Sequence, residues 1–288
     1  MTKVLCTDLD GTLFYPRAPF ALVNKKNREF LRDFIAQGNK VAMVSSRNES
    51  FLEKVKRRLD LPLDYIGTDG TVVNINGKTV LERVFDPEGA KQLIAEIRRE
   101  YDPGLILLAT KEHASIMTRT KVNKMTNLLY FLFEAVQGAY REPYIRSDHF
   151  FYSELAKGQV RKIMVLAGLS KKDQLAAKGI TADLAAKYPD FEFAWLNQFI
   201  EITPKGCSKA SGVAFYLDYL GLNQDNVVVV GDSGNDVPMF EAFHEQSYCM
   251  EHARPSIKEH AAHVISRVSD LRSVLCPSVD NTPSEKEG

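Results

Sequence analysis

Short apolar segments alternate with helical patterns near both ends of the 288-residue sequence, and this alternation constrains the fold most strongly. The apolar segment Lys3–Asp8 is followed by a helical pattern over Asn27–Gln37 and by a second apolar segment, Val41–Val44. The same order returns where a helical pattern over Lys209–Leu220 precedes the apolar run Val227–Val230. Buried strands that alternate with helices form a parallel sheet between two helix layers. The sequence therefore predicts an α/β core, which is a Rossmann-like, doubly wound parallel sheet.

The middle of the sequence has a different pattern, in which helices, strands and hairpins are mixed. The expected elements are helices at Ala90–Tyr101, Asn127–Val136 and Thr181–Lys187, and paired strands at Leu105–Ala109 and Ser115–Thr118. Such a mixture is typical of an α+β arrangement. We therefore expect an inserted α+β cap domain over residues 86–202.

The length of 288 residues allows two moderate domains, each with its own apolar interior. We expect the core to consist of two parts, residues 1–85 and residues 203–276. The tail, residues 277–288, is polar, contains two prolines and has almost nothing apolar to bury. Such a composition predicts disorder.

The charge balance excludes some classes of partner. The 37 basic and 37 acidic residues cancel, so no net field attracts nucleic acid or an anionic membrane. The longest apolar run, Leu128–Phe133, is far shorter than the roughly 20 residues needed to span a bilayer. We expect no nucleic-acid partner and no membrane partner. The expected partner is a small molecule, and the expected state is a monomer or homodimer.

The cysteines and the first residues indicate the cellular compartment. The four cysteines are scattered and form no CxxC motif, which argues against a metal cage or a disulfide framework: Cys6, Cys207, Cys249 and Cys276. Unpaired cysteines favour a reducing compartment. The sequence enters Lys3-Val4-Leu5 without an apolar signal region. We therefore expect a cytoplasmic protein.

Three histidines occur close together near the end of the sequence: His252, His260 and His263. The last two are three residues apart and could share one face of a helix. No carboxylate or cysteine pattern around them supports a zinc site. We therefore expect all three to be solvated surface residues.

Two carboxylates, Asp8 and Asp10, stand where the first apolar segment gives way to Gly11. Residues at positions i and i+2 of an extended strand share a face, so we expect these two side chains to lie close together. Two adjacent carboxylates cannot both ionise without an energetic cost. A divalent metal ion, or a proton on one of them, would remove the repulsion.

More carboxylates follow the late apolar strand, where Asp232 and Asp236 stand in a glycine-containing loop. Ligands of doubly wound sheets bind beyond the carboxyl ends of the strands. If the first and the late strand are neighbours, Asp8, Asp10, Asp232 and Asp236 converge. Carboxylate oxygens without imidazole or thiolate suit a hard cation, and octahedral Mg²⁺ fits best.

Two further polar residues are expected at the same edge. Ser45 ends the second strand, and Lys209 begins the helix that leads to the late strand. A hydroxyl, an ammonium group and a metal ion around a carboxylate would bind an anion, and phosphate is the natural ligand.

These motifs together closely resemble those of the haloacid dehalogenase-like hydrolases and, within them, the Cof-like sugar phosphatases. The resemblance covers residues 1–276, with the cap between the second and third motifs. In chain order, the matching motifs are Asp8-Leu9-Asp10-Gly11-Thr12, Ser45, Lys209, and Gly231-Asp232-Ser233-Gly234-Asn235-Asp236. The combination of the first motif with the last is highly specific.

The resemblance implies a covalent mechanism of phosphate-ester hydrolysis. Asp8 would attack phosphorus and form an aspartyl-phosphate. Asp10 would protonate the leaving alkoxide and then deprotonate the attacking water. Asp8, the Asp10 carbonyl group and Asp232 would hold Mg²⁺, with Asp236 in the same metal site.

The resemblance also assigns residues to the phosphate group. Ser45 and the Ser46 backbone N–H would bind the phosphoryl oxygens, and Lys209 would stabilise their charge. Arg47 is a candidate substrate contact. Asn235 and Asp236 would orient Lys209 and metal-bound waters.

Two segments depart from the pattern of the family. The chain has Ser45-Ser46-Arg47 where members commonly have Thr-Gly-Arg, and this difference keeps a hydroxyl group and the arginine. It has Thr68-Asp69-Gly70-Thr71 where the Cof-like branch often has Asn-Gly-Ala. This places an extra carboxylate, Asp69, near the mouth of the site and leaves the substrate open. Candidate specificity residues in the cap are His113, Arg119, Lys121, Lys124 and Trp195.

The sequence thus predicts a Mg²⁺-dependent phosphatase of small phosphorylated metabolites, with sugar phosphates as the expected class. One alternative is a phosphomutase of the phosphomannomutase type, which passes the phosphoryl group to a sugar. Another is a non-catalytic regulator that binds a phosphorylated metabolite. The presence of both a nucleophile and an acid–base residue argues against a pure binding protein.

Overall fold

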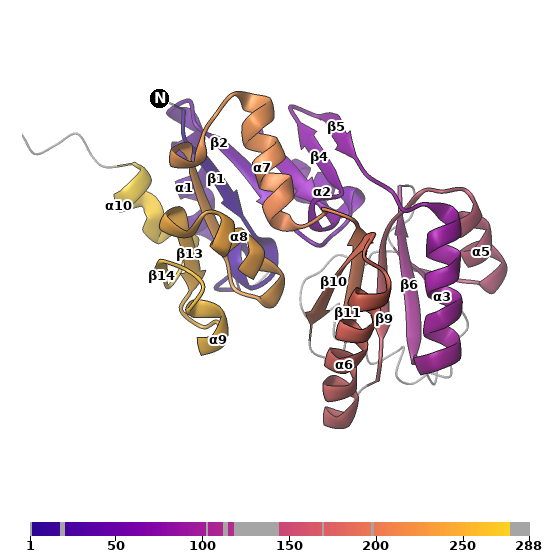
Figure 1. Ribbon diagram of the computed structural model, residues 1–288. Helices are drawn as coiled ribbons and strands as arrows, with labels where there is room; N and C mark the ends of the chain where they lie inside the picture. Colours follow the sequence, from indigo (N-terminus) through magenta and orange to yellow (C-terminus); the bar gives the residue numbers. More distant parts are fainter. Residues whose placement is uncertain are drawn as a thin grey trace, which may run out of the picture.

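The computed structural model describes residues 2–17, 21–101, 103–111, 115–117, 144–168, 170–196 and 199–276 (Figure 1). Several predictions concern residues outside these ranges: the helix at Asn127–Val136, the tail at 277–288, and the candidates His113, Arg119, Lys121 and Lys124. In the part of the chain that the structure describes, no helix has the length and apolar character needed to cross a membrane.

An eight-stranded sheet forms the core of the molecule. Its strands, in spatial order, are β14 (His263–Ile265), β13 (Ser247–Met250), β12 (Val227–Gly231), β1 (Val4–Thr7), β2 (Lys40–Val44), β3 (Asp64–Gly67), β4 (Val72–Ile75) and β5 (Lys78–Glu82). Neighbouring strands from β14 to β3 pair in parallel, and the β4–β5 hairpin adds an antiparallel edge. Thr7 pairs with both Val230 and Met43, so the carboxyl ends of β12, β1 and β2 lie side by side.

Helices cover both faces of this sheet. Leu5 packs with Phe30 on one face, whereas its neighbour Cys6 packs with Tyr216 on the other. Successive strand residues point to opposite faces, so central strands such as β1 and β12 are buried on both sides, whereas the edge strands β5 and β14 are partly exposed. The predicted doubly wound α/β core is confirmed. The helices of the core are α1 (Lys25–Ala36), α2 (Glu49–Leu59), α7 (Lys209–Leu220), α8 (Val237–Ala242), α9 (Pro255–Lys258) and α10 (Arg272–Leu275).

Side-chain caps decide where the helices begin. The Asn24 carboxamide oxygen accepts the backbone N–H of Asn27 at 3.0 Å, so α1 begins earlier than its apolar pattern alone predicts. The Ser208 hydroxyl accepts the backbone N–H of Ser211 at 3.1 Å. This cap places Lys209 in the first turn of α7, at the edge where the parallel strands end.

A six-stranded sheet forms a second unit, which we call the cap. Its strands, in spatial order, are β10 (Phe191–Leu196), β11 (Phe199–Pro204), β9 (Val160–Leu166), β6 (Leu105–Thr110), β7 (Ser115–Met117) and β8 (Tyr144–Arg146). All pairings are antiparallel except that of β7 with β8. The α+β character is as predicted. The domain boundaries stay predictions, and β11 runs to Pro204.

Three described helices accompany the cap sheet: α3 (Pro87–Tyr101), α5 (Asp148–Ala156) and α6 (Lys171–Lys187) (Figure 1). The helix α6 begins ten residues before its predicted start at Thr181. The Ser170 hydroxyl accepts the backbone N–H of Asp173, and the Asp173 carboxylate accepts that of Ser170. This capping box begins a helix whose exposed first turns carry no continuous apolar stripe.

The cap sheet buries one face against these helices and turns the other away from them. Leu108, Ile163 and Ile202 are neighbours on three adjacent strands of the buried face and pack with residues of α3, α5 and α6. Leu107 and Met164 are register partners on the opposite face and remain half-buried. Trp195 pairs with Ile200 and therefore lies on the helix-covered side, where Lys178 contacts its ring. Its predicted role as a specificity residue is not supported by this position.

Candidate active site

The loop after β1 brings two strand ends together. The Asp8 backbone N–H donates to the Val230 carbonyl at 2.9 Å, so Asp8 continues the ladder beyond β1. Gly11 has φ +85°, and a Cβ atom there would lie 2.4 Å from Oδ2 of Asp232. Only glycine allows this close approach. The Thr12 hydroxyl donates to Oδ1 of Asp232 at 2.9 Å and fixes that side chain.

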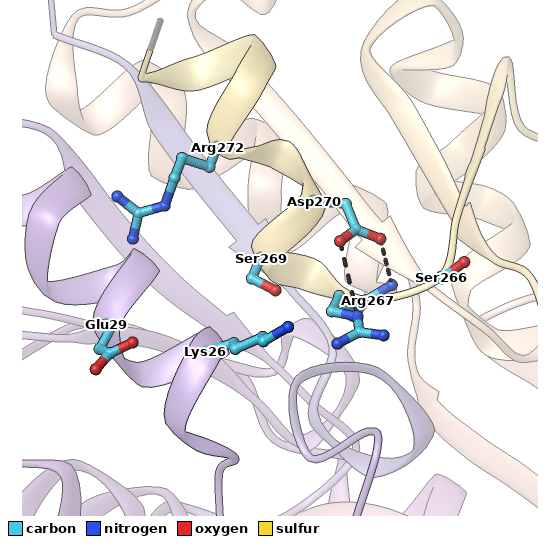
Figure 2. Close-up of a pocket in the computed structure, with 7 residues that line it drawn as sticks. All are labelled: Lys26, Glu29, Ser266, Arg267, Ser269, Asp270 and Arg272. Atoms are coloured by element: carbon cyan, nitrogen blue, oxygen red, sulfur yellow. Dashed lines mark hydrogen bonds and ion pairs between the residues drawn. The ribbon is translucent and has the colours of Figure 1, made fainter. Parts of the chain in front are cut away.

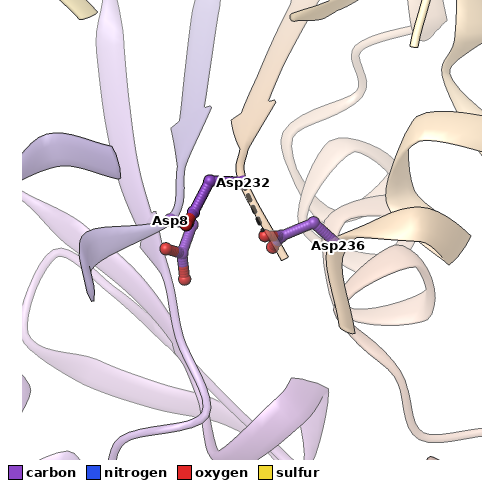
Figure 3. Close-up of side chains that lie close together, drawn as sticks. All are labelled: Asp8, Asp232 and Asp236. Atoms are coloured by element: carbon purple, nitrogen blue, oxygen red, sulfur yellow. Dashed lines mark hydrogen bonds between the residues drawn. The ribbon is translucent and has the colours of Figure 1, made fainter. Parts of the chain in front are cut away.

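Three carboxylates meet at this edge, those of Asp8, Asp232 and Asp236, as Figure 3 shows. Each offers one oxygen atom, and these atoms lie within 4.8 Å of one another. Burial raises the pKa of Asp8, and the negative charges of Asp236 and Asp232 raise it further. Burial followed by the charge of Asp236 raises the pKa of Asp232 to about 6. Three crowded carboxylate oxygen donors fit a hard cation such as Mg²⁺, because a cation would remove the repulsion between them.

Lys209 supplies a positive charge inside this cluster. Its Nζ atom lies 2.7 Å from Oδ1 of Asp8 and 2.6 Å from Oδ1 of Asp236, and the residue is only 1% exposed. Burial alone would lower the pKa of Lys209, but the charges of Asp236 and Asp8 outweigh burial and raise it. The ammonium group therefore stays charged next to the carboxylate of Asp8.

Asp236 also shapes the loop after β12. Its Oδ2 atom accepts the backbone N–H groups of Asp232 and Ser233, each at 2.9 Å. A Cβ atom on Gly231 would lie 2.4 Å from Cγ of Asp236, so the loop folds tightly around this side chain. Both carboxylate oxygens of Asp236 thus already have protein donors. This geometry is better suited to positioning Lys209 and Asp232 than to coordinating a metal ion directly.

Asp10 lies apart from the three carboxylates. Oδ2 and Oδ1 of Asp10 accept hydrogen bonds from Nε and Nη2 of Arg47 at 2.9 and 3.2 Å. The premise of the expected crowding, that Asp8 and Asp10 share one extended strand, is wrong, because β1 ends at Thr7 and Asp10 stands in the following loop. Each carboxylate has its own cation, Lys209 for Asp8 and Arg47 for Asp10.

The other predicted phosphate-binding residues lie at neighbouring strand ends. Ser45 is buried directly after β2, and its hydroxyl accepts the backbone N–H of Arg47 at 3.1 Å, with Ser46 half-buried between them. Asn235 donates from Nδ2 to Oδ1 of Asp69 at 3.4 Å. Its carboxamide is thus directed toward Asp69, and among the described contacts Asp236, not Asn235, holds Lys209.

A buried ion cluster beside the site was not predicted. Nζ of Lys162, from β9, lies 2.6 Å from Oδ2 of Asp69 and donates a shorter bond to Oε1 of Glu201, from β11. Only Asp69 carried a sequence signal, as a departure from the family pattern. Lys162 and Glu201 stand in strands whose pattern predicts structure only, so no motif could have identified them.

His252 lies beside the site, which the sequence did not predict. Its Nε2 atom lies 3.7 Å from Oδ2 of Asp232, and its ring centroid lies 4.1 Å from that of Tyr15. The residue is exposed, as expected for a surface histidine, and it also lies next to a carboxylate of the site. The sequence feature that comes nearest to indicating this position is that His252 follows the end of β13 by two residues.

Comparison with known proteins agrees with this geometry. The sequence model of the haloacid dehalogenase-like hydrolases matches residues 5–275. The chain belongs to this family. The resemblance predicted from the motifs is therefore confirmed, and the chain is a hydrolase of this superfamily.

Individual relatives of this hydrolase are distant but cover it almost completely. The stress response protein YhaX of Bacillus subtilis is 26% identical, over 94% of this chain and 90% of its own length. The putative phosphatase YkrA of the same species is 20% identical, over 93% and 94%.

Solved structures share the fold of this hydrolase. SMU.1108c from Streptococcus mutans has a TM-score of 0.76 at 20% identity, over 96% of this chain and 97% of its own. The subclass IIB sugar phosphatase BT4131 has a TM-score of 0.71 at 20% identity, over 95% and 98%. At such identities the likeness establishes the fold, including the cap, and no substrate.

The hydrolase also has a hollow of about 510 Å³ away from these residues, shown in Figure 2. It lies between α1 and the segment before α10 and contains the Arg267–Asp270 ion pair at 3.7 Å. The residues around it are Lys26, Glu29, Ser266, Arg267, Ser269, Asp270 and Arg272. It shares none of the predicted site residues, and it is an open polar depression without a buried unpaired group.

Proposed function

We propose that this hydrolase is a Mg²⁺-dependent phosphatase of small phosphorylated metabolites, with sugar phosphates as the expected class. The observation that carries the proposal is the position of Lys209 between Asp8 and Asp236, next to the oxygen cluster of Asp8 and Asp232. A nucleophilic carboxylate needs nearby positive charge to approach an anionic phosphate. The names of the relative YkrA and of the structural neighbour BT4131 support the same reaction class.

The geometry supports separate roles for the residues of the site in the first step. Lys209 holds Oδ1 of Asp8, which leaves Oδ2 to attack phosphorus. The new bond is the Asp8 Oδ2–P bond, and the bond that breaks joins phosphorus to the alkoxide oxygen. Asp10, held by Arg47 at the more exposed side of the site, would protonate that alkoxide. Hydrolysis of the aspartyl-phosphate then returns Asp8 and inorganic phosphate.

Asp8 and Asp232 would hold the Mg²⁺ ion, together with the Asp10 carbonyl group. The ion would supply positive charge that reduces the repulsion between the phosphate group and the carboxylates. Ser45 and the Ser46 backbone N–H would bind phosphoryl oxygens, and Lys209 would bind the same group from the opposite side. Asp236 would keep Lys209 in place.

The proposal is tested with a panel of phosphorylated metabolites, by measuring released phosphate with Mg²⁺ and with EDTA. We expect release only with Mg²⁺, and we expect Asp8→Asn to abolish it while the thermal melting curve stays cooperative. Conversion of a hexose phosphate into its isomer without free phosphate would instead show a phosphomutase. Binding without either product would show a regulator. Turnover by Asp8→Asn at the wild-type rate would remove the nucleophile assignment.

A further inference from the structure

Lys162, Asp69 and Glu201 form a buried ion cluster between the core and the cap. Asp69 belongs to the turn after β3 of the core, whereas Lys162 and Glu201 come from the cap strands β9 and β11. Lys162 is 2% exposed and Glu201 is 5% exposed. Nζ of Lys162 binds both carboxylates. Burial of such a cluster costs much desolvation free energy unless every charged group has a hydrogen-bond or ion-pair partner. The composition of the cluster therefore calls for a functional explanation.

The cluster adjoins the proposed phosphate site. The Asp69 backbone N–H donates to the Ser45 carbonyl at 3.2 Å. Oδ1 of Asp69 accepts from Asn235, which directly precedes the residue that holds Lys209. Burial and the charge of Asp69 raise the pKa of the Glu201 carboxyl group, and the charges of Lys162 and, more weakly, Lys209 oppose this rise. The leaving group of a phosphate ester bound by Ser45 and Lys209 would therefore lie near the cluster.

One atom of the cluster lacks a partner. Oε2 of Glu201 is buried and has no hydrogen-bond partner among the described residues. Glu201 pairs with Met164, which pairs in turn with Leu107, so its side chain stands on the face of the cap sheet away from the helices. Buried carboxylate oxygens normally have a partner. A ligand between this face and the core would supply it.

The charges of the cluster restrict what that ligand can be. One ammonium group faces two carboxylates, so the cluster is negative whenever Glu201 is ionised. Such a cluster attracts hydrogen-bond donors and repels a further anion. The apolar neighbours Met164 and Leu107 add no positive charge on the same face.

We propose that Glu201, Lys162 and Asp69 form the subsite for the alcohol part of the substrate, and that this subsite selects phosphate esters with hydroxyl or amino groups over esters with a second anionic group. The inference rests on the proposed phosphatase function and adds a substrate class to it. Glu201 is the specificity-determining residue, since its free oxygen would accept the donor of the substrate. Lys162 and Asp69 position its carboxylate.

Matched pairs of substrates test this proposal. Glycerol 3-phosphate has a CH2OH group where 3-phosphoglycerate has a carboxylate, and 6-phosphogluconate has a carboxylate at C1, where glucose 6-phosphate has its hemiacetal carbon. We expect the wild-type enzyme to have a kcat/KM at least about tenfold higher for the hydroxylated member of each pair it hydrolyses. A preference for the carboxylate members would overturn the proposal without any variant.

Two variants that change the charge in opposite directions give the second test. Glu201→Gln should reduce the preference within each pair by about tenfold or more, whereas Lys162→Gln should increase it. In Glu201→Gln, hydrolysis of p-nitrophenyl phosphate, whose leaving group offers no donor, should fall by a smaller factor than hydrolysis of the hydroxylated substrates. Equal losses on all substrates would show a structural role and would contradict the proposal.

Glu154→Gln is the matched control. Glu154 is also buried in the cap, pairs with Lys157 and leaves Oε2 without a partner among the described residues, but it belongs to α5 in the helix layer (Figure 1). It should leave the preference unchanged. Failure of the wild-type enzyme to release phosphate from p-nitrophenyl phosphate with Mg²⁺ would contradict the phosphatase function itself, which separates the two failures.

Discussion

Lys209 carries its charge inside the core, between carboxylates that follow two different strands. Asp8 comes after β1 and Asp236 after β12, and each lies within 2.7 Å of Nζ of Lys209. Removal of one partner from a buried ion pair leaves charges without compensation, which costs far more than the loss of an exposed pair. The same ammonium group would stabilise the phosphoryl group during transfer. Stability and turnover are therefore linked at this residue.

Lys209→Met should show both effects. We expect the free energy of unfolding at pH 7 in EDTA to fall by about 3–5 kcal/mol, because two buried carboxylates lose their cation. Phosphate release should fall by at least about 100-fold. Lys91→Met is the control, since Lys91 and Glu88 form an exposed pair at 2.7 Å. Urea unfolding of both variants measures the difference, and equal losses would contradict the argument.

At the scale of an element, the loop Leu9–Leu13 links Asp8, the proposed nucleophile, to Asp232. Gly11 adopts φ +85°, and the space for its Cβ is taken by the Asp232 carboxylate. The loop therefore depends on glycine for two reasons, backbone conformation and close approach. Gly38 allows the two causes to be distinguished. It has φ +82°, but no atom lies within 4 Å of the position that a Cβ atom would take.

Gly11→Ala and Gly38→Ala should therefore differ. We expect Gly38→Ala to lose about 1–2 kcal/mol of unfolding free energy from backbone strain alone, with normal turnover. Gly11→Ala should lose more, because the new methyl group also displaces Asp232, and its apparent affinity for Mg²⁺ should fall at least about tenfold. Chemical unfolding and Mg²⁺ titration of activity measure these effects. The same Mg²⁺ dependence in both variants would contradict the assigned contact.

At the scale of the whole molecule, ion pairs of two buried cap residues, Arg161 and Lys162, join the cap to the core. Arg161 of β9 binds Glu49 at 3.1 Å and Glu82 at 2.6 Å, both in the core, and the next residue, Lys162, binds Asp69. The two consecutive side chains thus extend to different parts of the core. Because Arg161 and Lys162 are themselves buried, these pairs should be screened by salt less than exposed surface pairs are.

Glu201 should make the stability of the molecule depend on pH. Burial and the charge of Asp69 raise the pKa of Glu201 to about 7. A folded-state pKa above the unfolded value means that this contribution to stability is complete below about pH 4 and is lost as the pH rises to about 7. Glu201→Gln has no such dependence. The unfolding free energy of Glu201→Gln minus that of the wild type should therefore increase by about 1–3 kcal/mol as the pH rises from about 4 to about 7.

Urea unfolding at several pH values, with EDTA present, measures this difference. EDTA excludes the contribution of a bound metal ion, and subtraction of the two curves cancels the other titrating groups. A difference that stays constant between pH 4 and pH 7 would show that Glu201 keeps its ordinary pKa in the folded protein.

Local pattern was sufficient for much of the fold and for part of the site. Continuous apolar strands such as Val227–Val230 identified the parallel core, because burial on both faces leaves no alternation. The motifs around Asp8 and Asp232 identified the strand ends that meet, since carboxyl ends of parallel strands share an edge. The family itself followed from the order of these motifs.

Tertiary structure decided the remaining features. The pairing of Asp10 with Arg47, the position of His252 beside Asp232 and the Lys162–Glu201 contact join residues from separate elements. Sequence patterns report periodicity along one element, and they carry no information on which side chains of two distant elements meet. The sequence by itself determined the reaction chemistry that the strand ends can support, whereas the packing of cap on core decided which charges surround it.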